Sequence, residues 1–287
     1  MDMDVITDVA MQVFVHLIKK NSSTINILGD SISDSLLKNL ILRANKNNFK
    51  ITHMSYSGNL YFPNFVKANK KTKKIEVDDK VHKFRENKIL SDTGNSYIIV
   101  VGQYSYYFEE SEHYLENEKI VSKDTNFFYV KKDDFELNKI NRIKKLKENF
   151  KKGILNFANK DFKILLLYPL PQSLEHVSKK VFGYHSFLDK NNEDFYKKLN
   201  DSDLHINYSF FKKKNKEIFD FFDQINHKNV YKIYPHKLFC NTKIKNKCIF
   251  HSKNDIFFFD RVHLSYSGSE LVNQLIFDKI NKIENKN

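Results

Sequence analysis

The chain has 287 residues, 41% of them hydrophobic, and contains 26 phenylalanines. This content excludes a disordered chain and is sufficient for the core of one large α/β domain. The formal net charge of +13 would suit a nucleic-acid-binding protein. Lysine is nevertheless scattered through nearly every segment, so we interpret the charge as a bias of the whole composition and expect no nucleic-acid partner. No segment has the length of apolar sequence that spans a bilayer.

The N-terminal 20 residues carry apolar side chains at helical spacing and end in Lys19-Lys20, a pattern that predicts an amphipathic helix. The segment lacks the basic start and the continuous apolar run of a signal peptide. We therefore expect residues 1–23 to form either a leader helix packed on the domain or a linker to a membrane portion. Residues 24–287, which no long Pro- or Gly-rich linker divides, are expected to form a single domain.

The first motif is a Gly-Asp-Ser turn between a strand and a helix. Thr24–Leu28 is short and rich in strand-forming residues, Gly29 permits a tight turn, and a helical pattern begins at Ser33. Ser31 would therefore lie at the end of a strand and at a helix N-terminus, where backbone N–H groups can stabilise an oxyanion. Such a serine can be a nucleophile, or it can simply cap the helix.

Apolar stretches alternate with helical patterns along the rest of the chain. Strands are expected at Phe49–Met54, Tyr97–Val101, Phe162–Tyr168 and Asn229–Tyr234, and helices at Asn138–Asn159 and within Asn207–His227. This alternation predicts a mainly parallel sheet with helices on both faces, which is a three-layer α/β/α fold. Ligands of such sheets bind beyond the carboxyl ends of the strands. Because Ser31, Gly58 and Gln103 each follow a strand, we expect them to meet at one edge of the sheet.

Three connecting segments are less regular. Tyr61–Lys88 is polar and poorly periodic, and we interpret it as a surface excursion. Tyr104–Phe108 is an aromatic loop, which can either stack on a sugar ring or pack inside the protein. His176 and His185 can contact substrate or be ordinary residues of a polar loop.

A second motif near the C-terminus supplies the groups that a serine nucleophile needs. Asp260 and His263 can act as the orienting carboxylate and the general base for Ser31. We therefore interpret Ser31 as a nucleophile rather than as a helix cap. Beyond this motif, Ser267 and Glu270 have the spacing of a capping box, which would open the last helix.

Together the two motifs resemble the SGNH (GDSL-like) hydrolases, which have Gly-Asp-Ser early and Asp-x-x-His late. The run Asp-Arg-Val-His-Leu-Ser-Tyr-Ser-Gly at 260–268 is similar to the SGNH domain fused to membrane-bound sugar O-acyltransferases of the acyltransferase-three family. Two other stretches match the same domain, namely Pro-Leu-Pro-Gln at 169–172 and the run from the strand at 229–234 to Cys240. The resemblance implies the SGNH hydrolase fold with a flavodoxin-like sheet.

The resemblance also assigns roles to residues outside the two motifs. Gly58 matches the glycine whose backbone N–H forms the oxyanion hole together with the Ser31 N–H, although an ordinary turn glycine would look the same. Many SGNH enzymes have an asparagine as the third donor, where this chain has Gln103 with the same amide on a longer side chain. The fused domains often carry a cysteine pair before Asp-x-x-His. The resemblance therefore implies a disulfide between Cys240 and Cys248, which would otherwise be expected as free thiols.

These observations predict a serine-dependent acyl-ester hydrolase or O-acyltransferase that acts on a carbohydrate, with no metal or cofactor. Ser31 would attack the ester, His263 would take its proton and Asp260 would orient His263. The resemblance favours acetyl transfer onto a polysaccharide or lipopolysaccharide in the periplasm or cell envelope, with a membrane acyltransferase module as partner. The alternative is a non-catalytic glycan-binding or partner-docking domain. The change to Gln103 favours that alternative, and the complete set of Ser31, Asp260 and His263 opposes it.

Overall fold

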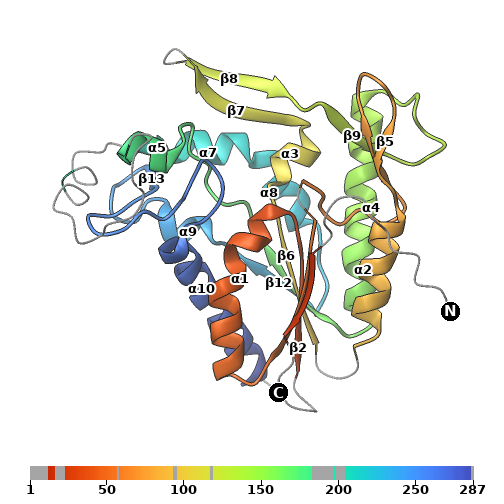
Figure 1. Ribbon diagram of the computed structural model, residues 1–287, viewed down its shortest axis with the longest axis horizontal. Helices are drawn as coiled ribbons and strands as arrows, with labels where there is room; N and C mark the ends of the chain where they lie inside the picture. Colours follow the sequence, from red (N-terminus) through yellow and green to blue (C-terminus); the bar gives the residue numbers. More distant parts are fainter. Residues whose placement is uncertain are drawn as a thin grey trace.

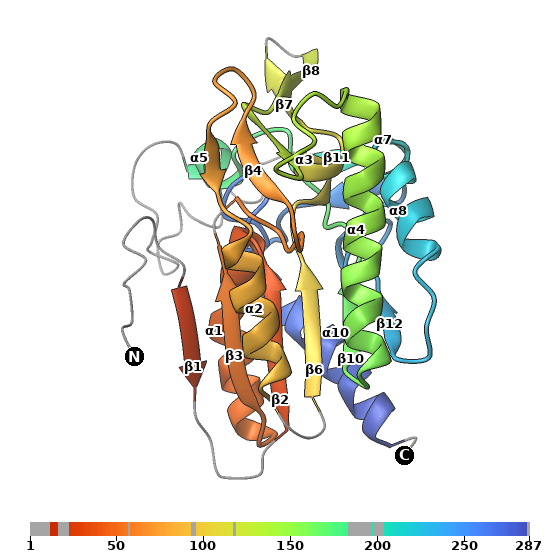
Figure 2. The ribbon, with the colours of Figure 1, turned by 90° about the vertical axis from the view of Figure 1, so that its right-hand side faces the viewer.

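A six-stranded sheet lies at the centre of the computed structural model, which describes residues 12–16, 23–56, 58–92, 96–116, 119–182, 197 and 204–285. The strand order is β1-β3-β2-β6-β10-β12 (Figure 2). The strands are β1 Gln12–His16, β2 Thr24–Gly29, β3 Lys50–Ser55, β6 Ser96–Val101, β10 Lys163–Leu167 and β12 Val230–Ile233. β1 is antiparallel to β3, and the other neighbours are parallel. Without β1 this is the flavodoxin-like order, which confirms the predicted fold class.

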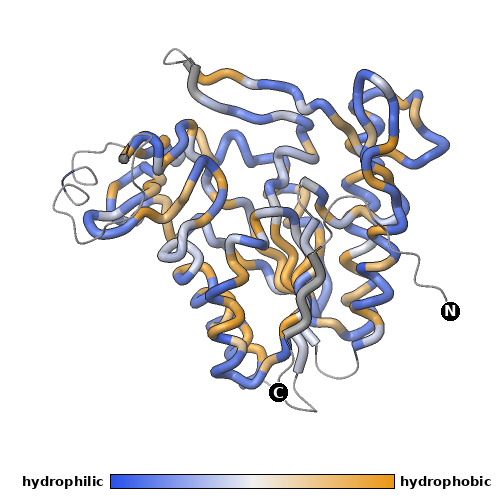
Figure 3. Tube along the Cα trace, viewed as in Figure 1, coloured by the Kyte–Doolittle hydropathy of each residue, from blue (hydrophilic) through white to orange (hydrophobic). Residues whose placement is uncertain are grey.

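Helices cover both faces of the sheet, which explains why its central strands are almost continuously apolar. On one face α1 (Ser31–Lys46) packs against α10 (Tyr266–Glu284). On the other face lie α2 (Lys80–Leu90), α4 (Lys139–Asn159) and α8 (Lys216–Asp223) (Figure 1). Hydrophobic residues consequently line both sides of the sheet, while hydrophilic residues are spread over the outer elements (Figure 3).

Smaller elements gather at the end of the molecule where the parallel strands finish (Figures 1 and 2). β4, β5 and β9 form an antiparallel sheet, β7 and β8 form a hairpin that projects beyond α3, and β11 pairs with β13. Their bounds are β4 Val66–Asn69, β5 Ile75–Val77, β7 Ser111–Glu116, β8 Lys119–Asp124, β9 Phe127–Val130, β11 His205–Asn207 and β13 Lys247–Ile249. The short helices are α3 Tyr104–Phe108, α5 Val177–Phe182, α7 Tyr208–Lys214 and α9 His236–Phe239. In the part of the chain that the structure describes, no helix is both long enough and apolar enough to cross a membrane.

The predicted N-terminal helix was wrong in the part that the structure describes, because Gln12–His16 is strand β1. It pairs along its whole length with β3. The outer edge of β3 would otherwise present unpaired backbone groups, and the Val-Phe-Val stretch of β1 suits a strand. The sheet therefore includes residues before the predicted domain start at 24. Residues 1–11 and 17–22 lie outside the described part of the chain.

The interpretation of Tyr61–Lys88 as a surface excursion was also wrong. Tyr61, Phe62 and Phe65 are fully buried in the core on the α4 face, where the Phe62 ring lies 6.0 Å from that of Phe150. The residues at 71–76, by contrast, are all exposed. A core built from scattered aromatic residues has no periodicity to detect, and this explains the error.

The aromatic loop at Tyr104–Phe108 is the short helix α3. Tyr104, Tyr107 and Phe108 are buried in the same core, so this segment packs inside the protein rather than stacking on a ligand.

The N-cap of the last helix is two residues before Ser267, the N-cap that the predicted capping box implies. Ser265 is the N-cap of α10, and its Oγ accepts a hydrogen bond from the Gly268 N–H at 3.2 Å. Glu270 does not cap the helix but forms an ion pair with Arg43 of α1. Likewise the single helix expected within Asn207–His227 is divided at Asn215 into α7 and α8.

Candidate active site

The register of the parallel strands brings three turns to the same edge of the sheet. Gly29 at the end of β2 pairs with Ser55 at the end of β3 and with Val101 at the end of β6. Ser31, Gly58 and Gln103 follow these three positions. The predicted convergence of the three turns is therefore present in the structure.

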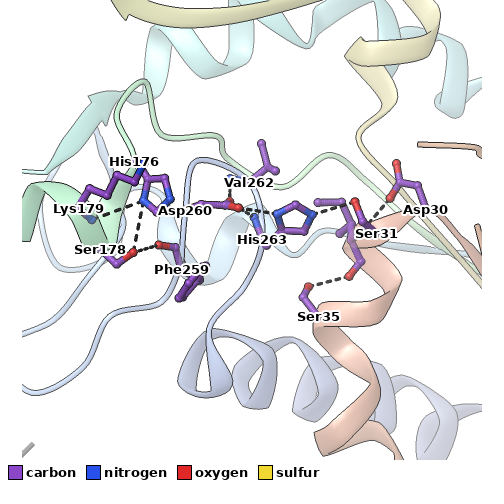
Figure 4. A network of polar contacts seen from close by, with 11 residues as sticks. Asp30, Ser31, Ser35, His176, Ser178, Lys179, Phe259, Asp260, Val262 and His263 are labelled. Atoms are coloured by element: carbon purple, nitrogen blue, oxygen red, sulfur yellow. Dashed lines mark hydrogen bonds and ion pairs between the residues drawn. The ribbon is translucent and has the colours of Figure 1, made fainter. Parts of the chain in front are cut away.

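The C-terminal motif meets the first of these turns. His263 Nε2 lies 2.8 Å from Ser31 Oγ, and His263 Nδ1 lies 2.7 Å from Asp260 Oδ2 (Figure 4). Both distances are within hydrogen-bond reach, as general-base activation of a nucleophile requires. The structure thus brings together two motifs that are 232 residues apart in the sequence.

The packing of α10 on α1 explains this meeting. The side-chain amide of Asn39 in α1 donates to the Tyr266 carbonyl at 2.9 Å, and that of Asn273 in α10 donates to the Leu36 carbonyl at 3.0 Å. Both amides are buried, so the two helices are fixed together by polar contacts as well as apolar ones. The loop before α10 is thereby held beside the N-terminus of α1.

Asp30, not Ser31, caps helix α1. Its Oδ1 accepts from the Ile32 N–H at 2.9 Å, and its Oδ2 accepts from the Gln103 N–H at 2.9 Å and from the Tyr107 hydroxyl at 2.8 Å. Burial raises the pKa of Asp30, while these hydrogen bonds act in the opposite direction. Ser31 is left as the first helical residue, whose N–H has no intrahelical acceptor and is available to a ligand. The interpretation of Ser31 as a helix cap is therefore excluded.

Asp260 is fixed by its own loop. Its Oδ1 accepts from the backbone N–H groups of Val262 and His263, each at 2.8 Å, so only Oδ2 faces the imidazole. Burial alone would raise the pKa of Asp260, but the hydrogen bonds from His263 and Val262 outweigh it and lower the pKa to about 2. The hydrogen bond to Asp260 in turn raises the pKa of His263, against the opposing effect of burial. This arrangement orients the imidazole and stabilises its protonated form.

Sequence reasoning missed a buried cation behind the site. Arg85 of α2 is fully buried and donates to the carbonyls of Asn59 at 3.1 Å and Gly29 at 3.5 Å. Burial lowers its pKa to about 10. Arg85 thus ties the turn after β3 to the end of β2. The helical spacing of Arg85 with His82 and Ile89 could have indicated that Arg85 is buried. These residues lie, however, in the segment that was interpreted as a surface excursion.

The sequence matches, over residues 13–278, the model of the family described as the SGNH domain (fused to AT3 domains). The chain belongs to this family. No curated protein matches the sequence.

The solved structures that resemble this SGNH domain are distant from it in sequence. The periplasmic domain of a lipopolysaccharide acetyltransferase from Salmonella ser. Paratyphi A is 17% identical, with a TM-score of 0.49, and the match covers 92% of this chain and 85% of that one. An acetyl xylan esterase is 13% identical, with a TM-score of 0.43 and coverage of 90% and 99%. A GDSL-like lipase from Bacteroides thetaiotaomicron is 11% identical, with a TM-score of 0.43 and coverage of 91% and 89%.

For Gly58 and Gln103, the two further oxyanion donors expected in the SGNH domain, the structure gives the conformation and contacts but no contact with a ligand. Gly58 has φ +63°, a conformation that favours glycine, and its carbonyl accepts from Lys67 Nζ and from the Tyr129 hydroxyl, each at 3.2 Å. The Gln103 N–H is occupied by Asp30, so only the side-chain amide of Gln103 is free to act as a donor. The roles of Gly58 and Gln103 remain predictions.

The remaining predicted residues are also located. Cys240 and Cys248 form a disulfide. Their Cα atoms are only 3.8 Å apart because the two residues face each other in an antiparallel β-bridge. His176 lies near Asp260, on the far side from His263 (Figure 4), whereas His185 lies outside the described residues. In the described ranges, no group of three or more His, Cys, Asp or Glu side chains is arranged to hold a metal ion.

Proposed function

We propose that this SGNH domain is a serine-dependent acyl-ester hydrolase or O-acyltransferase that handles an acyl group, most simply acetyl, on a carbohydrate. The observation that carries the proposal is the continuous hydrogen-bonded chain from Ser31 through His263 to Asp260. Family membership supports it, because the matched family is the one fused to AT3 domains. The motif at 260–268 supports a carbohydrate substrate through its resemblance to the domains fused to sugar O-acyltransferases.

The reaction would proceed through an acyl-enzyme. Ser31 Oγ attacks the acyl carbonyl while His263 Nε2 takes its proton, and Asp260 stabilises the imidazolium. The oxyanion that forms is held by the Ser31 N–H at the start of α1, with Gly58 and Gln103 as the further donors we predict. His263 then returns the proton to the departing alcohol oxygen, and the acyl group stays on Ser31.

The second half of the reaction reverses these steps with a new acceptor. His263 removes a proton from the acceptor while the acceptor oxygen attacks the acyl carbonyl, and His263 then gives this proton to the departing Ser31 Oγ. Water as acceptor gives an esterase, and a sugar hydroxyl gives a transferase. We propose a cell-envelope polysaccharide or lipopolysaccharide as the carbohydrate, a periplasmic or envelope location, and a membrane acyltransferase module as the donor partner.

Hydrolysis of 4-nitrophenyl acetate tests this proposal. Ser31→Ala should reduce kcat to the background rate. Ser35→Ala is the matched control, because Ser35 lies one turn further along α1 (Figure 4). Its hydroxyl donates to the Ile32 carbonyl at 2.7 Å and has no other partner in the described part of the chain. Wild-type turnover in Ser31→Ala would refute the proposed nucleophile. A folded wild-type protein without activity on any ester would favour the glycan-binding alternative.

A further inference from the structure

A cavity of about 240 Å³, lined mostly by residues with polar side chains, lies beside His263, and the steps described above place no ligand in it. Four separate segments line it: Gln103 after β6, Glu112 on β7, Gln172 and His176 after β10, and the loop at 260–263. The volume of the cavity leaves room for a ligand about the size of one sugar ring.

The lining of this cavity can both donate and accept hydrogen bonds. In the described residues, the amide of Gln103, the carboxylate of Glu112 and the guanidinium of Arg261 make no hydrogen bond or ion pair with another side chain. The Gln172 Oε1 accepts from Lys214 Nζ at 2.9 Å, which leaves the two amide hydrogens of Gln172 available. A ligand with several hydroxyls would satisfy this mixture, whereas a hydrocarbon chain would leave these groups unpaired.

The position of His263 shows which half of an ester belongs in this cavity. In either direction of the reaction, His263 Nε2 exchanges a proton with the alcohol oxygen and not with the acyl group. The alcohol must therefore reach His263, and His263 is part of the cavity wall. The acyl group needs only to reach Ser31, which is not part of that wall.

The hairpin of β7 and β8 forms one side of the cavity. It brings Glu112 and His113 to the cavity, and two residues beyond Glu112 along β7 the Tyr114 ring lies 5.6 Å from the Arg261 guanidinium of the catalytic loop. The Ser173 N–H, in the segment after β10, donates to the Arg261 carbonyl at 2.8 Å. Arg261 therefore contacts both the hairpin and the segment after β10, and these contacts hold three of the segments that line the cavity together.

We propose that this cavity binds the sugar ring that carries or receives the acyl group, and that Glu112 and Gln172 determine specificity by hydrogen bonding to its hydroxyls. This inference rests on the proposed function, because it assigns the alcohol side of that same reaction. Glu112 accepts from sugar hydroxyls, and Gln172 donates to them.

Two types of ester with the same acyl group test this assignment. The probes are 4-nitrophenyl acetate and a panel of monoacetylated glucose, galactose and N-acetylglucosamine, with acetate release as the common measurement. The quantity compared is the ratio of kcat/KM for the best sugar ester to kcat/KM for the aryl ester. The variants are Glu112→Ala and Gln172→Ala, and Glu136→Ala, which is exposed before α4, is the matched control.

Glu112→Ala should lower this ratio at least about tenfold, as expected for loss of a hydrogen bond to a charged group, and Gln172→Ala should lower it about three- to tenfold. The ratio for Glu136→Ala should equal that of wild type. An unchanged ratio in both cavity variants, with circular dichroism showing a native fold, would overturn the inference. Wild-type activity on the aryl ester but on no sugar ester would overturn it as well, while leaving Ser31 as the nucleophile. Failure to hydrolyse any of the esters would instead overturn the proposed function, and this inference with it.

Discussion

Replacing Asp260 by asparagine should disable His263 without disturbing the loop that holds it. The two backbone N–H groups of Val262 and His263 bond Oδ1, so in Asp260→Asn the amide oxygen is retained at that position. The amide NH₂ group then takes the place of Oδ2, 2.7 Å from His263 Nδ1. Because two donors cannot share one hydrogen bond, Nδ1 must become the acceptor and the ring proton must move to Nε2.

This tautomer cannot act as the base. With its proton on Nε2, His263 donates to Ser31 Oγ, at 2.8 Å, and cannot accept the serine proton. The same change in other serine triads lowers kcat by about 10⁴, which corresponds to roughly 5 kcal/mol in the activation barrier. We expect a loss of about 10³–10⁴ in kcat for Asp260→Asn.

The assay is steady-state hydrolysis of 4-nitrophenyl acetate, with thermal unfolding measured in parallel. Asp133→Asn removes the same charge at an exposed position and is the control. Since both backbone hydrogen bonds of the loop are kept, the Tm of Asp260→Asn should stay close to that of wild type. A loss of less than tenfold in kcat would refute the role assigned to Asp260.

Three further predictions concern pH, the oxyanion and the disulfide. Activity requires neutral His263, and its hydrogen bond to Asp260 raises its pKa above the ordinary 6.5. The pH profile of kcat/KM should therefore fall as the pH drops through a value above 6.5, and a midpoint below 6.5 would contradict this. If the Gln103 amide stabilises the oxyanion, Gln103→Ala should lower kcat by about 10²–10³ and leave KM nearly unchanged, whereas an effect on KM for sugar esters alone would place this amide in the sugar cavity. Replacing both Cys240 and Cys248 by serine should lower the free energy of unfolding in urea by about 2–3 kcal/mol, as expected for a short loop, and an unchanged midpoint would count against a structural role for this disulfide.

The central elements could be predicted because their signals are local. The apolar run before Gly29 and the helical pattern after Ser31 determine a strand–turn–helix within a few residues of each other. The alternation of such units restricts the topology to a parallel sheet with the turns at one edge. The chemistry of Asp260 and His263 then indicated which turn they must meet.

Features that depend on distant partners could not be predicted. β1 is a strand because the edge of β3 is available to it, and nothing within its own sequence reports that edge. The helical face that Arg85 shares with His82 and Ile89 indicates that it is buried, but nothing local shows that its guanidinium meets the carbonyls of Asn59 and Gly29. The sugar cavity depends on the hairpin at 111–124, whose position relative to Arg261 is set by tertiary packing.

The most direct test of the proposed nucleophile is intact-protein mass spectrometry after reaction with a fluorophosphonate. The reagent should add one phosphonyl group to the wild-type protein, and peptide mapping should locate it on Ser31. Ser31→Ala should remain unlabelled, His263→Ala should react far more slowly, and Ser35→Ala should react like wild type. Labelling of Ser31→Ala to the same extent as wild type, or attachment of the phosphonyl group to another residue, would contradict the catalytic role of Ser31.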